Sequence, residues 1–110
     1  MVLVIIPAIF ANTPKLQADV RRASQQLGND VVGVNFTLGF DSMGFASIFF
    51  KVVLANHAIN PNRLRQVAQQ VSLTLMNELH TDESGVHAYF NFRSQAEVAQ
   101  IHDPAWAAIP

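Results

Sequence analysis

The chain has 110 residues, of which 50% are hydrophobic and 14% are charged, and its formal net charge is −1. This length suffices for one hydrophobic core, so we expect a single domain over residues 1–110. A net charge so close to zero gives no long-range attraction to nucleic acid or to an anionic membrane. The absence of cysteine excludes disulfides, a thiolate nucleophile and a cysteine-ligated metal site.

The low charge content predicts a homo-oligomer. Globular domains average about 25% charged residues, so this chain has few charged groups with which to cover its apolar surface. A second copy would cover that surface, and we expect a homodimer. The alternative is a monomer with a well-filled core.

The apolar run from Val2 to Ala11 is too short to cross a bilayer, which needs about 20 residues. It also lacks the basic start of a signal peptide. We therefore expect a folded segment, no membrane association and a cytoplasmic location.

The chain begins with a run of β-branched and aliphatic residues, Val2 to Ile6, which ends at Pro7. A short unbroken apolar run is typical of a strand buried on both faces. The alternative is an exchanged arm that packs on a second chain. Thr13 and Pro14 then predict the start of a helix whose apolar stripe reaches Leu27.

The segment from Val31 to Leu54 predicts a β-hairpin. Its two arms, Val31–Phe40 and Phe45–Leu54, alternate apolar and other residues with the period of a strand. Asp41–Gly44 between them consists of turn-forming residues.

Asn60 and Pro61 predict a second helix, with a stripe of apolar residues that continues to Leu79. An exposed polar turn is expected at Thr81–Gly85, followed by a strand at Val86–Arg93. Ser94 and Glu97 have the spacing of a capping box, which predicts a short third helix. The apolar tail after Pro104 is expected to dock on its own domain or on a neighbour, or else to fray.

The expected order is β-α-β-β-α-β with a short C-terminal helix. This order predicts an α+β, ferredoxin-like two-layer sandwich in which both helices cover one face of the sheet. If Val2–Ile6 is not a strand of this sheet, the alternative is α-β-β-α-β with a three-stranded antiparallel sheet and an N-terminal arm.

The helix-free face of the sheet is the expected ligand or partner surface. It would combine aromatic side chains with polar groups that can orient an anionic or polar ligand. We therefore predict a binding or interaction module for a small molecule or a protein, with no cofactor and no metal. The predicted binding residues are Phe45, Phe49, Lys51, His87, Tyr89, Asn91 and Arg93.

The octapeptide from Met43 to Phe50 resembles the RNP1 motif of RNA-recognition domains, with matches at Gly44, Phe45, Ala46, Ile48 and Phe50. That resemblance implies single-stranded RNA binding as an alternative function, through Phe45, Tyr89, Lys51 and Arg93. Met43 stands where the motif has a basic residue, and Ser47 where it has a second stacking aromatic. Since RNA binding needs stacking and positive charge, nucleic acid is not the expected partner.

Ser47–Leu54 together with Tyr89–Ser94 also resembles a class of short bacterial proteins of unestablished function, of the mobile gene-cassette type. This resemblance implies no activity. A third hypothesis is an acid–base enzyme built around Asp41 and His87, although turn chemistry alone explains Asp41. We assign no catalytic residue, because the sequence has no hydrolase elbow, phosphate loop or dinucleotide fingerprint.

Overall fold

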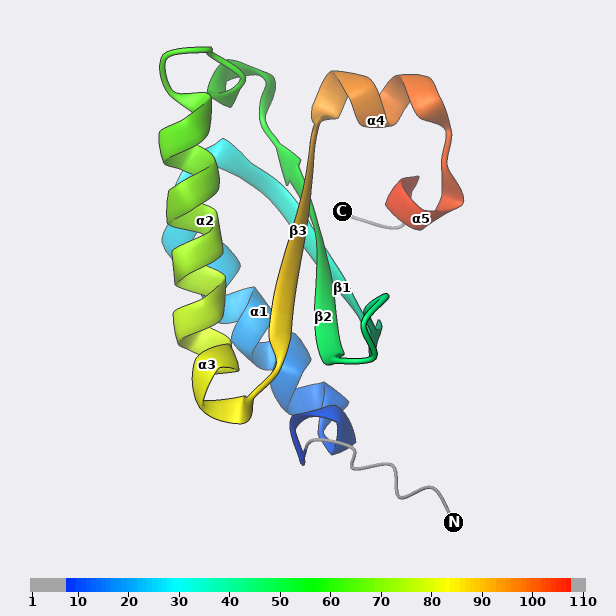
Figure 1. Cartoon of the computed structure of the whole chain (residues 1–110). Helices are drawn as coiled ribbons and strands as arrows, with labels where there is room; N and C mark the ends of the chain where they lie inside the picture. Colours follow the sequence, from blue (N-terminus) through cyan, green and yellow to red (C-terminus); the bar gives the residue numbers. More distant parts are fainter. Residues whose placement is uncertain (1–7, 108–110) are drawn as a thin grey trace.

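The structure, a computed structural model, describes residues 8–107 and is an α+β domain. Figure 1 shows two long helices, α1 (Thr13–Leu27) and α2 (Leu64–Leu79), on one face of a sheet. Within the described residues the sheet has three strands, β1 (Val31–Phe40), β2 (Ala46–Leu54) and β3 (His87–Ser94). Three short 3-10 turns lie between these elements. Ala8–Ala11 precedes α1, Gly28–Asp30 connects α1 to β1, and Asn56–Ala58 follows β2.

The sheet differs from both predicted topologies. β1 and β2 form the expected antiparallel hairpin, but β2 and β3 pair directly and in parallel. A ferredoxin-like sheet would have a further strand between β2 and β3, but these two strands are neighbours in the described residues. The alternative prediction was a three-stranded sheet that is antiparallel throughout, but β2 and β3 are parallel. The predicted strand Val2–Ile6 lies outside the described residues. The parallel pairing arises because α2 carries the chain back across the sheet, so that β3 runs in the direction of β2.

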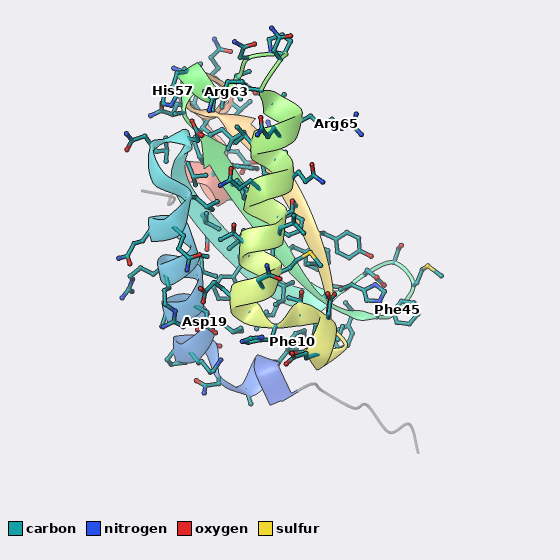
Figure 2. All side chains as sticks on the ribbon, turned by 90° about the vertical axis from the view of Figure 1, so that its left-hand side faces the viewer. Phe10, Asp19, Phe45, His57, Arg63 and Arg65 are labelled. Carbon is teal, nitrogen blue, oxygen red and sulfur yellow. The ribbon has the colours of Figure 1, made fainter. Side chains whose placement is uncertain are left out.

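The crossover from β2 through α2 to β3 has the common right-handed sense. Figure 2 looks at the sheet from the helix side, with α1 on the left and α2 on the right. In that view β3 lies to the right of β2, and β1 lies to its left. β1 is therefore an edge strand that lies beneath α1.

Local signals place the helix starts within a few residues. Asn12, not Thr13, is the N-cap of α1, since its side chain accepts from the backbone N–H of Lys15 at 3.2 Å. Asn is at least as good a cap as Thr, which explains the shift of one residue. The second helix starts at Leu64 rather than beside Asn60, because the Asn60 side chain accepts from Asn62 N–H at 2.9 Å and closes a preceding turn.

The core lies between the helices and the inner face of the sheet. Phe50 of β2 is 1% exposed, and its ring stacks on that of Phe90 with 5.0 Å between centroids. The helices contribute the stripes that the sequence predicts. The buried core residues include Leu16, Val20, Ala23, Ile48, Val52, Leu54, Val67, Val71, Leu75 and Leu79.

The segment after α2 is mostly exposed, as predicted, but it is helical and its first residue is buried. It forms one turn of helix, α3 (Thr81–Ser84), after His80 adopts a left-handed backbone conformation with φ 52°. Thr81 is fully buried, because α3 folds back against the end of α2 and the start of β3. The composition of this segment is polar, and only the tertiary packing reveals the burial of Thr81.

The C-terminal segment packs on the other face of the sheet. The predicted capping box is confirmed, because Ser94 Oγ accepts from Glu97 N–H at 3.1 Å and Glu97 Oε1 accepts from Ser94 N–H at 3.2 Å. It starts α4 (Gln95–Ile101), which is followed by α5 (Pro104–Ala107). Figure 1 shows both helices on the side of the sheet opposite to α1 and α2. The tail thus docks on its own domain, with Trp106 only 2% exposed.

Candidate functional site

Residues 8–107 cover the outer face of the sheet at one end and leave it open at the other. The strand register aligns Gly33, Val53 and Arg93 in a row at the covered end. The guanidinium of Arg93 lies 5.1 Å from the centroid of the Trp106 ring, and Val53 in the middle of this row is buried. The predicted helix-free face is therefore free of helices over part of its length only.

The open end presents two further rows that cross all three strands. In one row Thr37, Phe49 and Tyr89 are register partners, and in the next row Asn35, Lys51 and Asn91 are partners. The rings of Phe49 and Tyr89 are stacked, with 5.4 Å between centroids and 14° between planes. Adjacent rows in a sheet bring their side chains within reach of one another, so Lys51 and Asn91 border this aromatic pair.

These rows line a shallow groove of about 290 Å³, whose lining includes Thr37, Phe49, Lys51, Tyr89 and Asn91. Apolar rings and a few convergent polar groups are typical of ligand sites. Within residues 8–107, Lys51 forms no ion pair with a carboxylate. The groove therefore offers a cation that no described acidic group neutralises.

Phe45 and His87 form a second aromatic pair at the end of the open face. Their rings are stacked, with 4.7 Å between centroids and 19° between planes. Phe45 belongs to the hairpin turn rather than to β2, since that strand begins at Ala46. Figure 2 shows Phe45 at the tip of the hairpin, where its ring projects from the turn.

Asp41 is held in place by three hydrogen bonds. Its Oδ1 accepts from the backbone N–H groups of Met43 and Phe45, each at 2.9 Å. Its Oδ2 accepts from the hydroxyl of Tyr89 at 2.7 Å. The carboxylate thus closes the hairpin turn, in which Gly44 has φ 84°, and also joins that turn to β3.

These hydrogen bonds shift the titration of both side chains. The Tyr89 hydroxyl, followed by the Phe45 backbone N–H, lowers the pKa of Asp41 below its ordinary value of 3.8. The same hydrogen bond raises the pKa of Tyr89 above its ordinary value of 10.0. Each shift favours the charged acceptor and the neutral donor, which are the forms that the hydrogen bond needs.

The structure brings the two residues of the enzyme hypothesis within ion-pair distance but not within hydrogen-bond distance. His87 Nδ1 lies 3.6 Å from Asp41 Oδ2, which is beyond hydrogen-bond distance. A carboxylate that already accepts three hydrogen bonds and has a lowered pKa is a weak base at neutral pH. The structure therefore gives Asp41 a role in the turn.

The remaining histidines are distributed over the surface. His57 Nε2 lies 3.1 Å from Asp30, which also pairs with Arg63 at 3.3 Å, and Figure 2 shows His57 and Arg63 at the same end of the molecule. Among the described residues, no group of three or more His, Asp or Glu side chains converges as a metal site would require. In the same part of the chain, no helix is both long and apolar enough to span a bilayer.

The structure brings most of the predicted binding residues together. Phe49, Lys51, Tyr89 and Asn91 line the groove, whereas Phe45 and His87 lie at its hairpin end and Arg93 lies under the C-terminal segment. The sequence analysis placed Asp41 near His87, and the structure has the two side chains 3.6 Å apart, but it missed the Tyr89–Asp41 hydrogen bond. A comparison of the sequence with known protein families and with curated proteins found no match.

Proposed function

We propose that this protein is a binding module whose open sheet face holds a ligand with a flat apolar part and an anionic group. The observation that carries this proposal is the position of Lys51 beside the stacked rings of Phe49 and Tyr89. The rings would contact the flat part of the ligand, and the Lys51 ammonium would pair with its anionic group. Thr37 and Asn91 would supply hydrogen bonds from the flanking strands.

The Tyr89 hydroxyl has a defined part in this arrangement. Its proton is donated to Asp41, so Tyr89 would meet the ligand with its ring and with the lone pairs of its oxygen. The hydrogen bond also holds the ring against Phe49. This support reduces the side-chain entropy that a ligand would have to overcome on binding.

Two features favour binding over the alternative functions. Asp41 already accepts three hydrogen bonds, from the hairpin turn and from Tyr89, which argues against it as a catalytic base. RNA would require several cations along a stacking surface, but Arg93 lies against Trp106, and within the described part of the chain Lys51 is the one cation that lines the groove.

Chemical-shift mapping with simple aromatic anions tests the proposal. Benzoate at millimolar concentration should move the amide resonances of Phe49, Lys51 and Asn91, and neutral benzamide should move them far less. Lys51→Met should abolish the difference between the two probes. Arg65→Met is a matched control, because Arg65 is an exposed cation that projects from α2 away from the sheet (Figure 2). Equal responses to benzoate and benzamide, or shifts elsewhere only, would contradict the proposal.

A further inference from the structure

Among residues 8–107, no strand pairs with the outer edge of β1. Asp41 N–H donates to the Phe45 carbonyl at 2.9 Å across the hairpin. Backbone groups alternate in direction along a strand, so Val34, Phe36 and Leu38 direct theirs away from β2. The N–H of Phe36 accordingly bonds to the Asn35 side chain at 2.8 Å and not to another strand.

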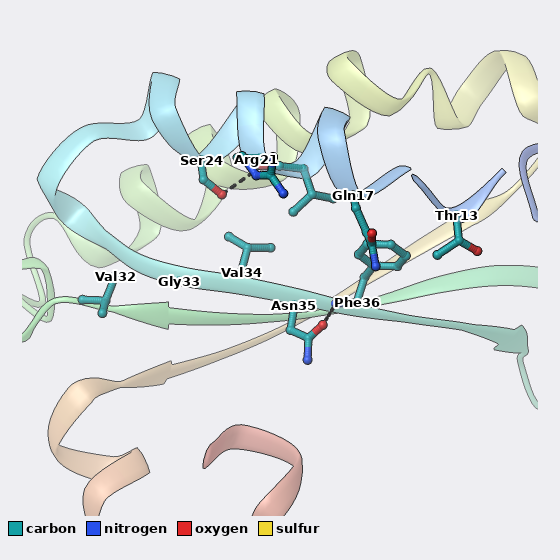
Figure 3. Close-up of a pocket in the computed structure, with 10 residues that line it drawn as sticks. Thr13, Gln17, Arg21, Ser24, Val32, Gly33, Val34, Asn35 and Phe36 are labelled. Atoms are coloured by element: carbon teal, nitrogen blue, oxygen red, sulfur yellow. Dashed lines mark hydrogen bonds between the residues drawn. The ribbon is translucent and has the colours of Figure 1, made fainter. Parts of the chain in front are cut away.

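A groove of about 400 Å³ runs between this edge and α1. Figure 3 shows Arg21 and Ser24 on the helix side and Val32, Val34 and Phe36 on the strand side. A cavity of roughly 150 Å³ can hold a benzene molecule. The groove between α1 and β1 can therefore receive two or three aliphatic side chains next to an edge that can accept a strand.

This edge lacks the usual protection against strand addition. Proteins commonly shield edge strands with charged residues, proline or very short strands. β1 is ten residues long and contains neither a charged residue nor proline. Val32 and Phe40 are also 39% and 51% exposed.

The part of the chain outside the structure begins close to this edge. The Phe10 ring lies 6.4 Å from the Phe40 ring, so the first described turn sits at the C-terminal end of β1. The residues before it include Val2–Ile6, which are uncharged and aliphatic. Five extended residues span about 17 Å, which is half of β1.

The handedness of the fold favours a partner's segment over the chain's own. β1 runs opposite to β2, so a right-handed crossover through α1 into β1 would have to start on the β2 side of β1. β2 already occupies that side. A strand on the outer edge from the same chain would make the rare left-handed crossover, which a segment from another copy avoids.

We propose that Val2–Ile6 of one copy adds as a strand to the outer edge of β1 in a second copy, with alternate side chains in the groove beneath α1. The exchange is reciprocal in a two-fold dimer. It buries the exposed Val32 and satisfies the outward backbone groups of Val34, Phe36 and Leu38. The groove beneath α1 is on the opposite face of the sheet from the ligand groove, and each proposal can fail without the other.

Cysteine cross-linking tests whether the added strand comes from a second copy and whether it pairs with the edge of β1. The chain has no native cysteine that would interfere. We would mix a Val4→Cys chain with a Thr37→Cys chain of different mass and oxidise the mixture gently. A mixed disulfide between the two chains is expected, since Thr37 is an exposed residue of β1. Val4→Cys mixed with Asn91→Cys, an exposed position on the opposite edge strand β3, should give little product. Preferential linkage to Asn91→Cys, or no linkage to Thr37→Cys, would overturn the proposal.

Sedimentation of the full chain provides an independent measurement. The unmodified protein should be a dimer, and both Val4→Pro and Val32→Lys should shift it to monomer by blocking strand addition. Leu73→Lys is the matched control, since it also introduces a lysine but at a position on α2 that is 54% exposed. This variant should remain a dimer. Unchanged far-ultraviolet circular dichroism would show that the variants are folded. A monomeric native chain, or a dimer that resists both substitutions, would refute the exchange.

Discussion

The hydroxyl of Tyr89 donates a 2.7 Å hydrogen bond to Asp41, and this bond fastens β3 to the turn of the β1–β2 hairpin. The two residues are 48 positions apart in the sequence. It adds a side-chain link to the parallel backbone pairing of β2 with β3. It also fixes the ring of Tyr89, which stacks on Phe49 in the proposed ligand groove.

The titration of Tyr89 should report this hydrogen bond directly. Tyr89 is the only tyrosine of the chain, so the absorbance of tyrosinate near 295 nm follows this residue alone. The pKa of Tyr89 should lie above 10.0 in the native protein. In Asp41→Asn it should fall towards that value, because the negative acceptor is gone. An unchanged titration in this variant would show that the hydrogen bond does not persist in solution.

The stability of the fold should depend on the charge of Asp41 at acid pH. Its pKa is lowered in the folded state, so its contribution is complete above the unfolded value of 3.8 and is lost as the pH falls through the folded value. Urea unfolding of the native chain and of Asp41→Asn should therefore differ near neutral pH and converge as the pH falls below the lowered pKa of Asp41. A stability difference that stays constant over this range would contradict the assignment.

Local sequence signals were enough for most of the elements. The hairpin follows from alternation on both arms and from Asp41–Gly44, and the helices follow from apolar stripes such as that ending at Leu79. These features depend on residues close in sequence. The capping box of Ser94 and Glu97 was predictable to the residue for the same reason.

The pairing of β3 and the docking of the C-terminus were not predictable in this way. Nothing in His87–Ser94 itself specifies whether the strand lies beside β2 or beyond another strand, since alternation is the same in either order. Likewise Trp106 could have been assigned to a frayed tail, because its burial depends on how the C-terminal segment folds back, where its ring meets Arg93 of β3. The candidate face could be predicted, but the part that remains open could not.

The capping box should contribute measurably to stability. Ser94→Ala removes the acceptor for Glu97 N–H and should lower the free energy of unfolding by about 1 kcal/mol. Ser72→Ala is a suitable control, because Ser72 lies inside α2, where its hydroxyl bonds to the Ala68 carbonyl and alanine is the better helix former. Guanidinium unfolding of both variants provides the comparison. A loss in Ser72→Ala as large as that in Ser94→Ala would contradict the role of the cap.

Two phenylalanines close in sequence should differ strongly in their energetic roles. Phe50 is 1% exposed at the centre of the core, so Phe50→Ala should cost about 3–5 kcal/mol of unfolding free energy. Phe45 is 49% exposed and contacts His87 mainly through ring stacking, so Phe45→Ala should cost about 1 kcal/mol or less. Thermal unfolding monitored by circular dichroism would measure both. Similar losses would show that the hairpin tip is more deeply packed than this structure has it.

Arg93 was predicted as a ligand contact, whereas its position points to a structural role. Its guanidinium lies over Trp106, and its Nε is buried without a hydrogen-bond partner among the described residues. Arg93→Met keeps an aliphatic stem but removes the cation–π contact, which contributes about 0.5–2 kcal/mol. The emission of Trp106, the only tryptophan, should then shift to longer wavelength as the C-terminal segment loosens. The response to benzoate should survive in Arg93→Met and fall to the level of benzamide in Lys51→Met, since Lys51 lines the groove and Arg93 does not. Loss of benzoate binding in Arg93→Met with an unchanged Trp106 spectrum would instead place Arg93 in the binding site.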